Sequence, residues 1–354
     1  MNKPVTLSAV AIAAGVSKAT ASNVFNWPQR VRPVVRLRVE AAANRLGYFG
    51  PDPKGRLLSA GKTYAIGVVM PGSYGISIAF RHPYMRDFLA GVTDICEENG
   101  TGLVLVSGIK DQENGGIRNA LVDGFILGHL AEMDLLAAAK RRRLPIVVMD
   151  SEGGPDVSSV RIDDHGGAML AAQHLIDLGH RRFAIVSTSR LSGHAPIFHS
   201  AGSKRHQLAA GYPPDMERLS GVAEVLASVG IATDDVPIIE INSNEGVAEG
   251  AALLLDSAPD ATAILCIAGD PQAIGILAEA RRRNIVVPDD LSVVGFDDNP
   301  EAAVANPPLT TVMQPVIEKG RTAARILFEK GPVQHVALPV TLVIRSSTAK
   351  PRKI

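Results

Sequence analysis

The sequence predicts an all-α helix-turn-helix head followed by an α/β body of two doubly wound parallel-sheet subdomains. Apolar residues recur at helical spacing within the first 50 residues, whereas short β-branched runs alternate with helical stretches after residue 64. Charge divides the chain in the same way. Residues 1–63 hold ten lysines and arginines but two acids, a net charge of +8, and the remaining residues carry −8. A basic head on an acidic body is typical of a nucleic-acid-binding module joined to a domain of another kind.

Length and composition set the broad class of the protein. A chain of 354 residues fits two or three domains, and an apolar fraction of 46% is enough for well-formed cores. No apolar run is long enough to span a membrane, and the N-terminus lacks the basic and apolar regions of a secretory signal. Cys96 and Cys266 lie in apolar surroundings and are expected to be reduced core residues. We therefore expect a cytoplasmic protein with no membrane partner.

The stretch from Thr6 to Asn26 has the pattern of two short helices joined by a tight turn. One face of the first helix is apolar, with the spacing i, i+3, i+4 and i+7: Leu7, Val10, Ala11 and Ala14. Thr6 and Ser17 are suited to cap the two helices, and Gly15 accepts the positive φ that a sharp turn needs. A helix-turn-helix of this kind lays its second helix in the DNA major groove. An ordinary helical hairpin fits the same spacing.

A third helix is expected from about Pro33 to Leu46. Proline suits the first helical position because its missing N–H would have no partner there, and Gly47 is suited to end the helix. Arg32, Arg36 and Arg38 are left for the phosphate backbone of a nucleic acid. Such contacts supply affinity and salt dependence, whereas sequence choice comes from base contacts.

The body is predicted from near-continuous apolar strands that alternate with helical stretches. The expected strands are 65–70, 102–107, 122–127, 145–150, 159–162, 182–187, 263–268 and 291–296. This number of strands is too large for one small sheet, so two subdomains with a ligand cleft between them are expected. Ligands of open α/β sheets bind at the carboxyl ends of strands, where Asp150, Asp270 and Asp297 lie. A single acid at such a position can equally cap the next helix.

Motifs for catalysis and cofactor binding are absent from the sequence. No G-x-G-x-x-G run opens the first βα unit, and no Walker motif or nucleophile elbow is found. His194, His199 and His206 lack the tight spacing of metal ligands. We therefore expect no enzyme, cofactor or metal. The alternatives are a solute-binding protein or an α/β enzyme that shares the body fold. The first predicts a secretory signal and no basic head, and the second needs a nucleophile and a base.

Two runs near the N-terminus, VTLSAVAIAAGVSKATASNVFN and RVRPVVRLRVEAAANRLGY, resemble the LacI/GalR family of bacterial transcription regulators. The likeness continues in order to the end of the chain. It implies a periplasmic-binding-protein-like body that crosses between its subdomains near Asp163–Asp164, near Thr311–Pro315 and near LPVTLVIRSST. The expected divisions are a head over 1–50, a hinge over 51–63 and a body over 64–354, with an N-subdomain of about 64–163 and 315–340 and a C-subdomain of about 164–314 and 341–354.

The resemblance implies which head residues contact DNA. The outward positions of the second helix that touch base edges correspond to Lys18, Ala19 and Asn23. Many relatives carry arginine, which favours guanine, where this chain has Asn23. Because asparagine favours adenine, we expect adenine at that place in the half-site. The complete expected set is Thr6, Ser17, Lys18, Ala19, Thr20, Ser22, Asn23, Asn26, Arg32, Arg36, Tyr48, Arg56 and Leu58.

The hinge, residues 51–63, resembles the family segment that becomes helical only on DNA. Leu58 corresponds to the leucine that wedges into the central base step of the minor groove. Pro51 and Pro53 limit such a helix to about two turns, and a helix this short is marginal alone. A plain flexible linker is the alternative interpretation.

The resemblance also implies an effector site, in which carboxylates accept hydrogen bonds from hydroxyls and an arginine donates them. The expected effector-binding residues are Tyr84, Met85, Asp150, Arg218, Asp270 and Asp297. Gly269 stands where relatives often carry asparagine, and two loops, 71–84 and 187–217, are longer than is common and could enlarge or cover the pocket. The function implied is that of a dimeric, effector-controlled repressor of a near-palindromic operator. The effector is expected to be a sugar or sugar derivative, and an activator remains open.

Overall fold

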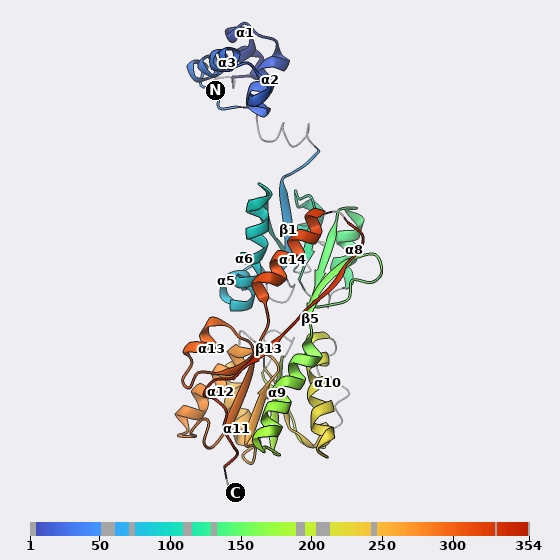
Figure 1. Ribbon diagram of the computed structural model, residues 1–354, viewed down its shortest axis with the longest axis vertical. Helices are drawn as coiled ribbons and strands as arrows, with labels where there is room; N and C mark the ends of the chain where they lie inside the picture. The colour runs from blue at the N-terminus through green and yellow to red at the C-terminus, as the bar shows by residue number, and fades with distance from the viewer. Residues whose placement is uncertain are drawn as a thin grey trace. The chain divides into compact units, whose positions relative to one another are not determined.

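A helical head and an α/β body make up the chain, as the sequence predicts (Figure 1). They form separate compact units that divide between Thr63 and Tyr64. The structure, a computed structural model, describes residues 5–50, 61–70, 75–108, 115–128, 133–188, 195–202, 213–241, 246–329 and 331–352.

The head consists of short helices around a small apolar core. Its elements are α1 (Leu7–Ala14), α2 (Lys18–Asn26), the 3-10 turn η1 (Pro28–Arg30) and α3 (Pro33–Leu46). Thr6 Oγ1 accepts a hydrogen bond from the Ala9 amide at 3.3 Å, and Ser17 Oγ accepts one from the Thr20 amide at 3.0 Å. Gly15 ends α1 with φ of 61°. Both predicted caps and the predicted turn are therefore confirmed.

The N-lobe of the body is built on a parallel sheet with the strand order β12-β5-β4-β3-β1-β2. Its strands are β1 (Ala65–Met70), β2 (Gly102–Ser107), β3 (Phe125–Leu127), β4 (Ile146–Met149), β5 (Ser158–Ile162) and β12 (His335–Leu338). Its helices are α5 (Ile78–Arg81), α6 (Pro83–Glu98), α7 (Gly115–Asn119), α8 (Met133–Arg141) and α14 (Val316–Glu329).

The C-lobe is built on a second sheet with the order β13-β11-β10-β9-β6-β8-β7, in which the outer strands β13 and β7 are antiparallel to their neighbours. Its strands are β6 (Phe183–Thr188), β7 (Ile197–His199), β8 (Ile238–Ile241), β9 (Ala263–Cys266), β10 (Ser292–Asp297), β11 (Thr310–Met313) and β13 (Thr341–Val343). Its helices are α9 (Asp164–Leu178), α10 (Pro213–Ser228), η2 (Thr233–Asp235), α11 (Val247–Ser257), α12 (Asp270–Arg282) and α13 (Pro300–Val304).

The chain passes between the two sheets three times. It leaves the N-lobe sheet after β5, returns from β11 to α14, and leaves again between β12 and β13 (Figure 1). Because nearly all strands are parallel, the residues that follow them gather at one edge of each sheet. Asp150 follows β4 of the N-lobe, and Asp297 ends β10 of the C-lobe.

Helices α6 and α14 of the N-lobe pack closely because glycines lie where they cross. A Cβ atom on Gly91 would come within 1.9 Å of the Ile317 carbonyl oxygen. One on Gly320 would come within 2.2 Å of the Phe88 carbonyl oxygen. Any side chain at either position would force the backbones apart, so these glycines hold α14 against α6.

The long segment after β6 extends the C-lobe sheet in its described part. Residues 197–199 form the edge strand β7, which pairs with β8. His199 Nε2 lies 2.8 Å from Glu240 Oε1, a carboxylate buried in β8. This part of the segment therefore widens the sheet, whereas Pro213, Pro214 and Glu217 at its end line a cavity. Residues 189–194 and 203–212 lie outside the described residues.

Candidate functional site

A cavity of about 620 Å³ lies between the two lobes of the body. The loop after β4 and the first turns of α9 and α10 contribute to its wall. The lining residues are Leu136, Lys140, Asp150–Asp156 and Arg161 of the N-lobe, with Asp164, Pro213, Pro214 and Glu217 of the C-lobe. Arg161 Nη1 lies 3.5 Å from Glu217 Oε1, so an ion pair joins the lobes at this wall. A cavity of this size accommodates a small organic ligand.

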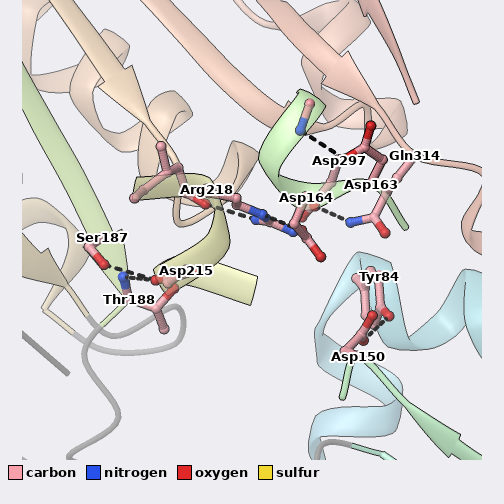
Figure 2. Close-up of polar contacts among 12 residues, drawn as sticks. Tyr84, Asp150, Asp163, Asp164, Ser187, Thr188, Asp215, Arg218, Asp297 and Gln314 are labelled. Atoms are coloured by element: carbon pink, nitrogen blue, oxygen red, sulfur yellow. Dashed lines mark hydrogen bonds and ion pairs between the residues drawn. The ribbon is translucent and has the colours of Figure 1, made fainter. Parts of the chain in front are cut away.

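Asp150 lies at the end of β4, with a positive φ of 53°. Its carboxylate is buried and accepts a hydrogen bond from Tyr84 Oη at 2.7 Å (Figure 2). It accepts a second hydrogen bond from Lys319 Nζ at 2.6 Å. Burial alone would raise the pKa of Asp150, but the ammonium of Lys319 and these hydrogen bonds lower it overall. Asp150 is therefore held in its ionised form.

Asp297 lies at the end of β10 of the C-lobe, with φ of 110°. Its Oδ1 accepts a hydrogen bond from Gln314 Nε2 at 2.5 Å (Figure 2). Burial raises the pKa of Asp297 to about 6, although the nearby charge of Arg218 and the hydrogen bond from Gln314 lower it. This acid therefore changes its charge between weakly acidic and neutral pH.

Arg218 extends from α10 toward the same region and is 5% exposed. Its Nε donates to Asp164 Oδ1 at 2.7 Å, and its Nη1 donates to the Ile267 carbonyl oxygen at 2.8 Å (Figure 2). Its guanidinium carbon lies 3.7 Å from the centroid of the Phe296 ring. The planar group is thus held in one orientation by two hydrogen bonds and an aromatic face.

Two residues expected at the effector site make structural contacts. Asp270 is fully buried, with Oδ1 accepting from Thr311 Oγ1 at 2.6 Å and Oδ2 from the Asn299 amide at 2.8 Å. Met85 is 8% exposed and packs in the apolar core of the N-lobe. Asp270 thus ties loops together and Met85 fills a core, and a role for either residue in effector binding stays a prediction.

In the head, α2 presents an open face. Lys18, Ala19 and Asn23 are all exposed on it, whereas Ala21 and Val24 are buried against the rest of the head. This arrangement leaves the three outward side chains available to a base edge.

Four other residues expected to contact DNA hydrogen-bond to one another within the head. Ser17 Oγ lies 2.8 Å from Thr20 Oγ1, and Asn26 Nδ2 donates to Ser22 Oγ at 3.1 Å.

Other expected DNA contacts flank this face. Arg32 is exposed, and Arg36 Nε lies 3.7 Å from Glu40 Oε1 in a partly exposed ion pair along α3. Tyr48 packs edge-on against Phe25, with ring centroids 5.4 Å apart. Arg56 and Leu58 lie outside the described residues.

Comparison with known proteins identifies the family. Residues 6–50 match bacterial regulatory proteins of the lacI family, and residues 172–348 match the periplasmic binding protein-like domain. An HTH-type transcriptional regulator of Mycobacterium tuberculosis is 35% identical to this chain, over 98% of this chain and 97% of the relative. The chain belongs to the LacI family of bacterial transcriptional regulators.

Solved structures of LacI-family proteins share both parts of the fold. The lac repressor dimer bound to operator and the anti-inducer ONPF matches with a TM-score of 0.78 and 25% identity, over 98% of this chain and 100% of that one. A complex of the transcriptional regulator CelR with cellobiose matches with a TM-score of 0.67 and 29% identity, over 97% of this chain and 100% of that one. The LacI-family body is thus a ligand-binding domain attached to a DNA-binding head.

Sequence reasoning missed two residues of the site, Lys319 and Gln314. Lys319 carried a signal, because a lysine interrupts the apolar stripe of α14 formed by Val316, Gly320 and Ala323. A charge on the buried face of a helix needs a buried partner. Gln314 carried no such signal, since a glutamine before a helix is ordinary.

Within the described ranges, no helix is long and apolar enough to cross a membrane. The same part of the chain contains no cluster of three or more histidine, cysteine, aspartate or glutamate side chains that could hold a metal ion.

Proposed function

We propose that this LacI-family regulator is a repressor that binds a near-palindromic operator as a homodimer and is controlled by a small effector in the cleft of its body. The exposed face of α2, in an N-terminal part (residues 1–63) with a net charge of +8, is the observation on which the proposal chiefly rests. Two-fold symmetric dimers place two heads on two half-sites, so a palindromic site follows from symmetry. The absence of catalytic motifs from the sequence supports a regulator over an enzyme.

Base choice in the half-site is proposed to come from Lys18, Ala19 and Asn23. An asparagine side chain can donate to N7 and accept from N6 of adenine, whereas arginine pairs with O6 and N7 of guanine. Asn23→Arg is therefore expected to change the preferred base from adenine to guanine at one position in each half-site. An unchanged base preference would contradict this assignment.

The effector is proposed to be an uncharged, hydroxyl-rich molecule such as a sugar or sugar derivative. The charged groups at the cleft occur in pairs: Asp150 with Lys319, and Asp164 with Arg218. A phosphorylated ligand would have to compete with these acids for a cation. Hydroxyl groups, in contrast, can donate to Asp150 and Asp297 without displacing either pair. The cellobiose held by CelR supports a ligand of this class.

Control of DNA binding is proposed to act through the orientation of the two lobes. The N-lobe follows the hinge in the chain, so a ligand that favours one orientation decides whether paired hinge segments, with Leu58, can enter the minor groove. Effector and operator affinities are then linked reciprocally, typically by about 1–3 kcal/mol. Equal effector affinity for free and operator-bound protein would contradict this linkage.

The test is a selection of random duplex DNA by the purified protein at about physiological salt, because phosphate contacts make affinity depend steeply on salt. We expect an enriched near-palindrome with a constant central step. The selected duplex then allows sugars and their phosphate esters to be compared by the change that each causes in operator affinity. Failure to enrich any sequence, with and without these compounds, would contradict the proposed function.

A further inference from the structure

Lys319 is a deeply buried cation of the N-lobe, with 1% of its surface exposed. It projects from α14 of the N-lobe and donates three hydrogen bonds. The acceptors are Asp150 Oδ1 at 2.6 Å, Gln314 Oε1 at 3.0 Å and Tyr84 Oη at 3.2 Å. An ammonium has three N–H groups, so each proton of Lys319 has an acceptor. A cation in this setting holds its partners in one arrangement, since losing any acceptor leaves a buried donor unsatisfied.

Gln314 connects this cluster to the C-lobe. Its Oε1 accepts from Lys319, and its Nε2 donates to Asp297 Oδ1 at 2.5 Å. The two neighbours determine how the amide is oriented, because an ammonium can only donate and an ionised carboxylate can only accept. A continuous polar chain therefore runs from Asp150 through Lys319 and Gln314 to Asp297. It starts in one lobe and ends in the other.

The two ends of this chain belong to rigid parts of the molecule. On the N-lobe side, Gly91 and Gly320 lock α14 against α6, so Lys319 moves with the lobe. On the C-lobe side, Gln314 follows β11. Its backbone N–H donates to the Asp297 backbone carbonyl oxygen at 3.4 Å, in addition to the contact between the two side chains. The joint between these parts is Pro315, which lies between β11 and α14. A change in lobe orientation at this crossing must therefore alter the distance from Gln314 Oε1 to Lys319 Nζ.

We infer that Lys319 is a positioning residue of the effector site, which orients Asp150 and, through Gln314, links it to Asp297 across the lobe crossing. A ligand that hydrogen-bonds to Asp150 or Asp297 therefore contacts the same row of hydrogen-bonded side chains whose geometry depends on the orientation of the lobes. The regulatory meaning of this link rests on the effector site proposed above. The link itself is a property of the free body and can be tested without DNA or a ligand.

The experiment measures the distance between the lobes with spin labels on cysteines introduced at Leu121 and Val304. These side chains are 68% and 82% exposed and lie in the N-lobe and the C-lobe, respectively. The natural cysteines, Cys96 and Cys266, are buried and should not react. Labelled chains are diluted with unlabelled ones so that distances within one chain dominate.

Two variants break the polar chain from Asp150 to Asp297, called the bridge below, in different ways. Gln314→Met keeps the length of the side chain but removes both hydrogen bonds. Lys319→Met combined with Asp150→Asn removes the ammonium without leaving a buried carboxylate unpaired. We expect either change to widen the single distance distribution of the parent protein or to add a second population. Circular dichroism establishes that each variant is folded before its distances are interpreted.

Arg325→Met is the matched control. Arg325 also pairs with an acid, Glu318, at 2.6 Å, but both residues belong to α14 of the N-lobe, the pair is partly exposed, and neither residue lines the cavity. Its distance distribution should equal that of the parent protein. Parent-like distributions in both bridge variants would overturn the inference.

A second measurement separates positioning from a merely structural role. With the selected operator and a sugar that shifts operator affinity, the parent protein should bind that sugar about 5–150-fold differently in the free and operator-bound states. Gln314→Met should bring this ratio at least threefold closer to one, whereas Arg325→Met should preserve it. An unchanged ratio in Gln314→Met would overturn the inference. If no operator is selected, the proposed function fails, but the distance measurement still decides whether the bridge links the lobes.

Discussion

Asp150 and Asp297 occupy matching places in the two lobes, and the comparison shows how one fold can treat the same side chain in opposite ways. Each follows or ends a strand of a parallel sheet, each has a positive φ, and each is buried. Asp150 is paired with the Lys319 ammonium, which helps to lower its pKa. Asp297 is paired with a neutral amide, and burial raises its pKa to about 6. The N-lobe acid thus carries a fixed charge, whereas the C-lobe acid is titratable.

The difference follows from the neighbours that each lobe supplies. The N-lobe brings a lysine from α14 to the end of β4, so the cost of burying Asp150 is offset by a direct ion pair. In the C-lobe, Arg218 donates a hydrogen bond to Asp164. Arg218 therefore lowers the pKa of Asp297 only through its charge. Position in the sheet alone therefore does not determine the charge of an acid.

Removal of the Lys319 ammonium, the charge that distinguishes Asp150 from Asp297, should have the largest effect on the free energy of unfolding. Lys319→Met leaves Asp150 buried without a counter-ion, which typically costs about 3–5 kcal/mol in the free energy of unfolding. Because the pKa of Asp150 is lowered in the folded state, the contribution of the pair is present at neutral pH and is lost as pH falls through that lowered pKa. Urea unfolding at pH 7 and at pH 3 would measure both the loss and its decrease.

The controls for this prediction are Lys140→Met, which removes a largely exposed ion pair worth at most about 1 kcal/mol, and Lys319→Met with Asp150→Asn. The double variant should recover much of the stability lost by the single one. A loss as small as that of Lys140→Met would show that the buried pair does not distinguish the two acids.

Asp297→Asn should have the next largest effect, with the opposite sign. A rise in pKa from 3.8 to about 6 means that the folded protein binds this proton more tightly than the unfolded chain. The ionised carboxylate therefore costs up to about 3 kcal/mol above pH 6, and the cost disappears as pH falls toward 4. We expect the variant to be more stable than the parent at pH 8 and equally stable at pH 4.

Asp289→Asn is the control for Asp297→Asn, because Asp289 is an exposed carboxyl group of the same lobe. Its stability difference from the parent should not vary over this pH range. Thermal unfolding from pH 4 to pH 8 measures both variants. A constant difference for Asp297→Asn would show that Asp297 is ionised throughout, as Asp150 is.

Tyr84→Phe should have the smallest effect and would sharpen the description of the Asp150 side. It removes the 2.7 Å hydrogen bond to Asp150 and the 3.2 Å hydrogen bond from Lys319 while the Asp150–Lys319 ion pair remains, so a loss of about 2 kcal/mol in the free energy of unfolding is expected. Tyr64→Phe, at an exposed ring of the same lobe, should change stability little. A loss equal to that of Lys319→Met would show that the tyrosine, and not the ammonium, dominates the site.

Local patterns were sufficient for the head and for the class of the body. Caps at Thr6 and Ser17, the turn at Gly15 and the apolar faces of the helices depend on residues a few positions apart, so they could be read directly. The buried strands were also recognisable, because parallel strands are apolar on both faces. Two short strands with polar residues were not predicted: β8 contains Glu240, and β11 begins with Thr310 and Thr311.

The candidate site was predicted only in part. Asp150, Arg218 and Tyr84 could be selected because acids at strand ends and the family resemblance point to them. Asp270 looked equivalent to Asp297 in the sequence, yet its carboxylate is used to join Thr311 and the Asn299 backbone. The sequence shows that an acid follows a strand, but not which neighbour will occupy its oxygens.

The sequence by itself determined the family, the helical head, the α/β body and the strand ends at which polar groups gather. These properties depend on local spacing and on hydrophobic periodicity. The tertiary structure alone decided that Lys319 reaches Asp150, 169 residues away in the chain, and that Gln314 joins them to Asp297. It also decided the charge state of each acid. The physical reason is that burial and a partner within about 3 Å shift a pKa far more than sequence neighbours do, and only folding brings such partners together.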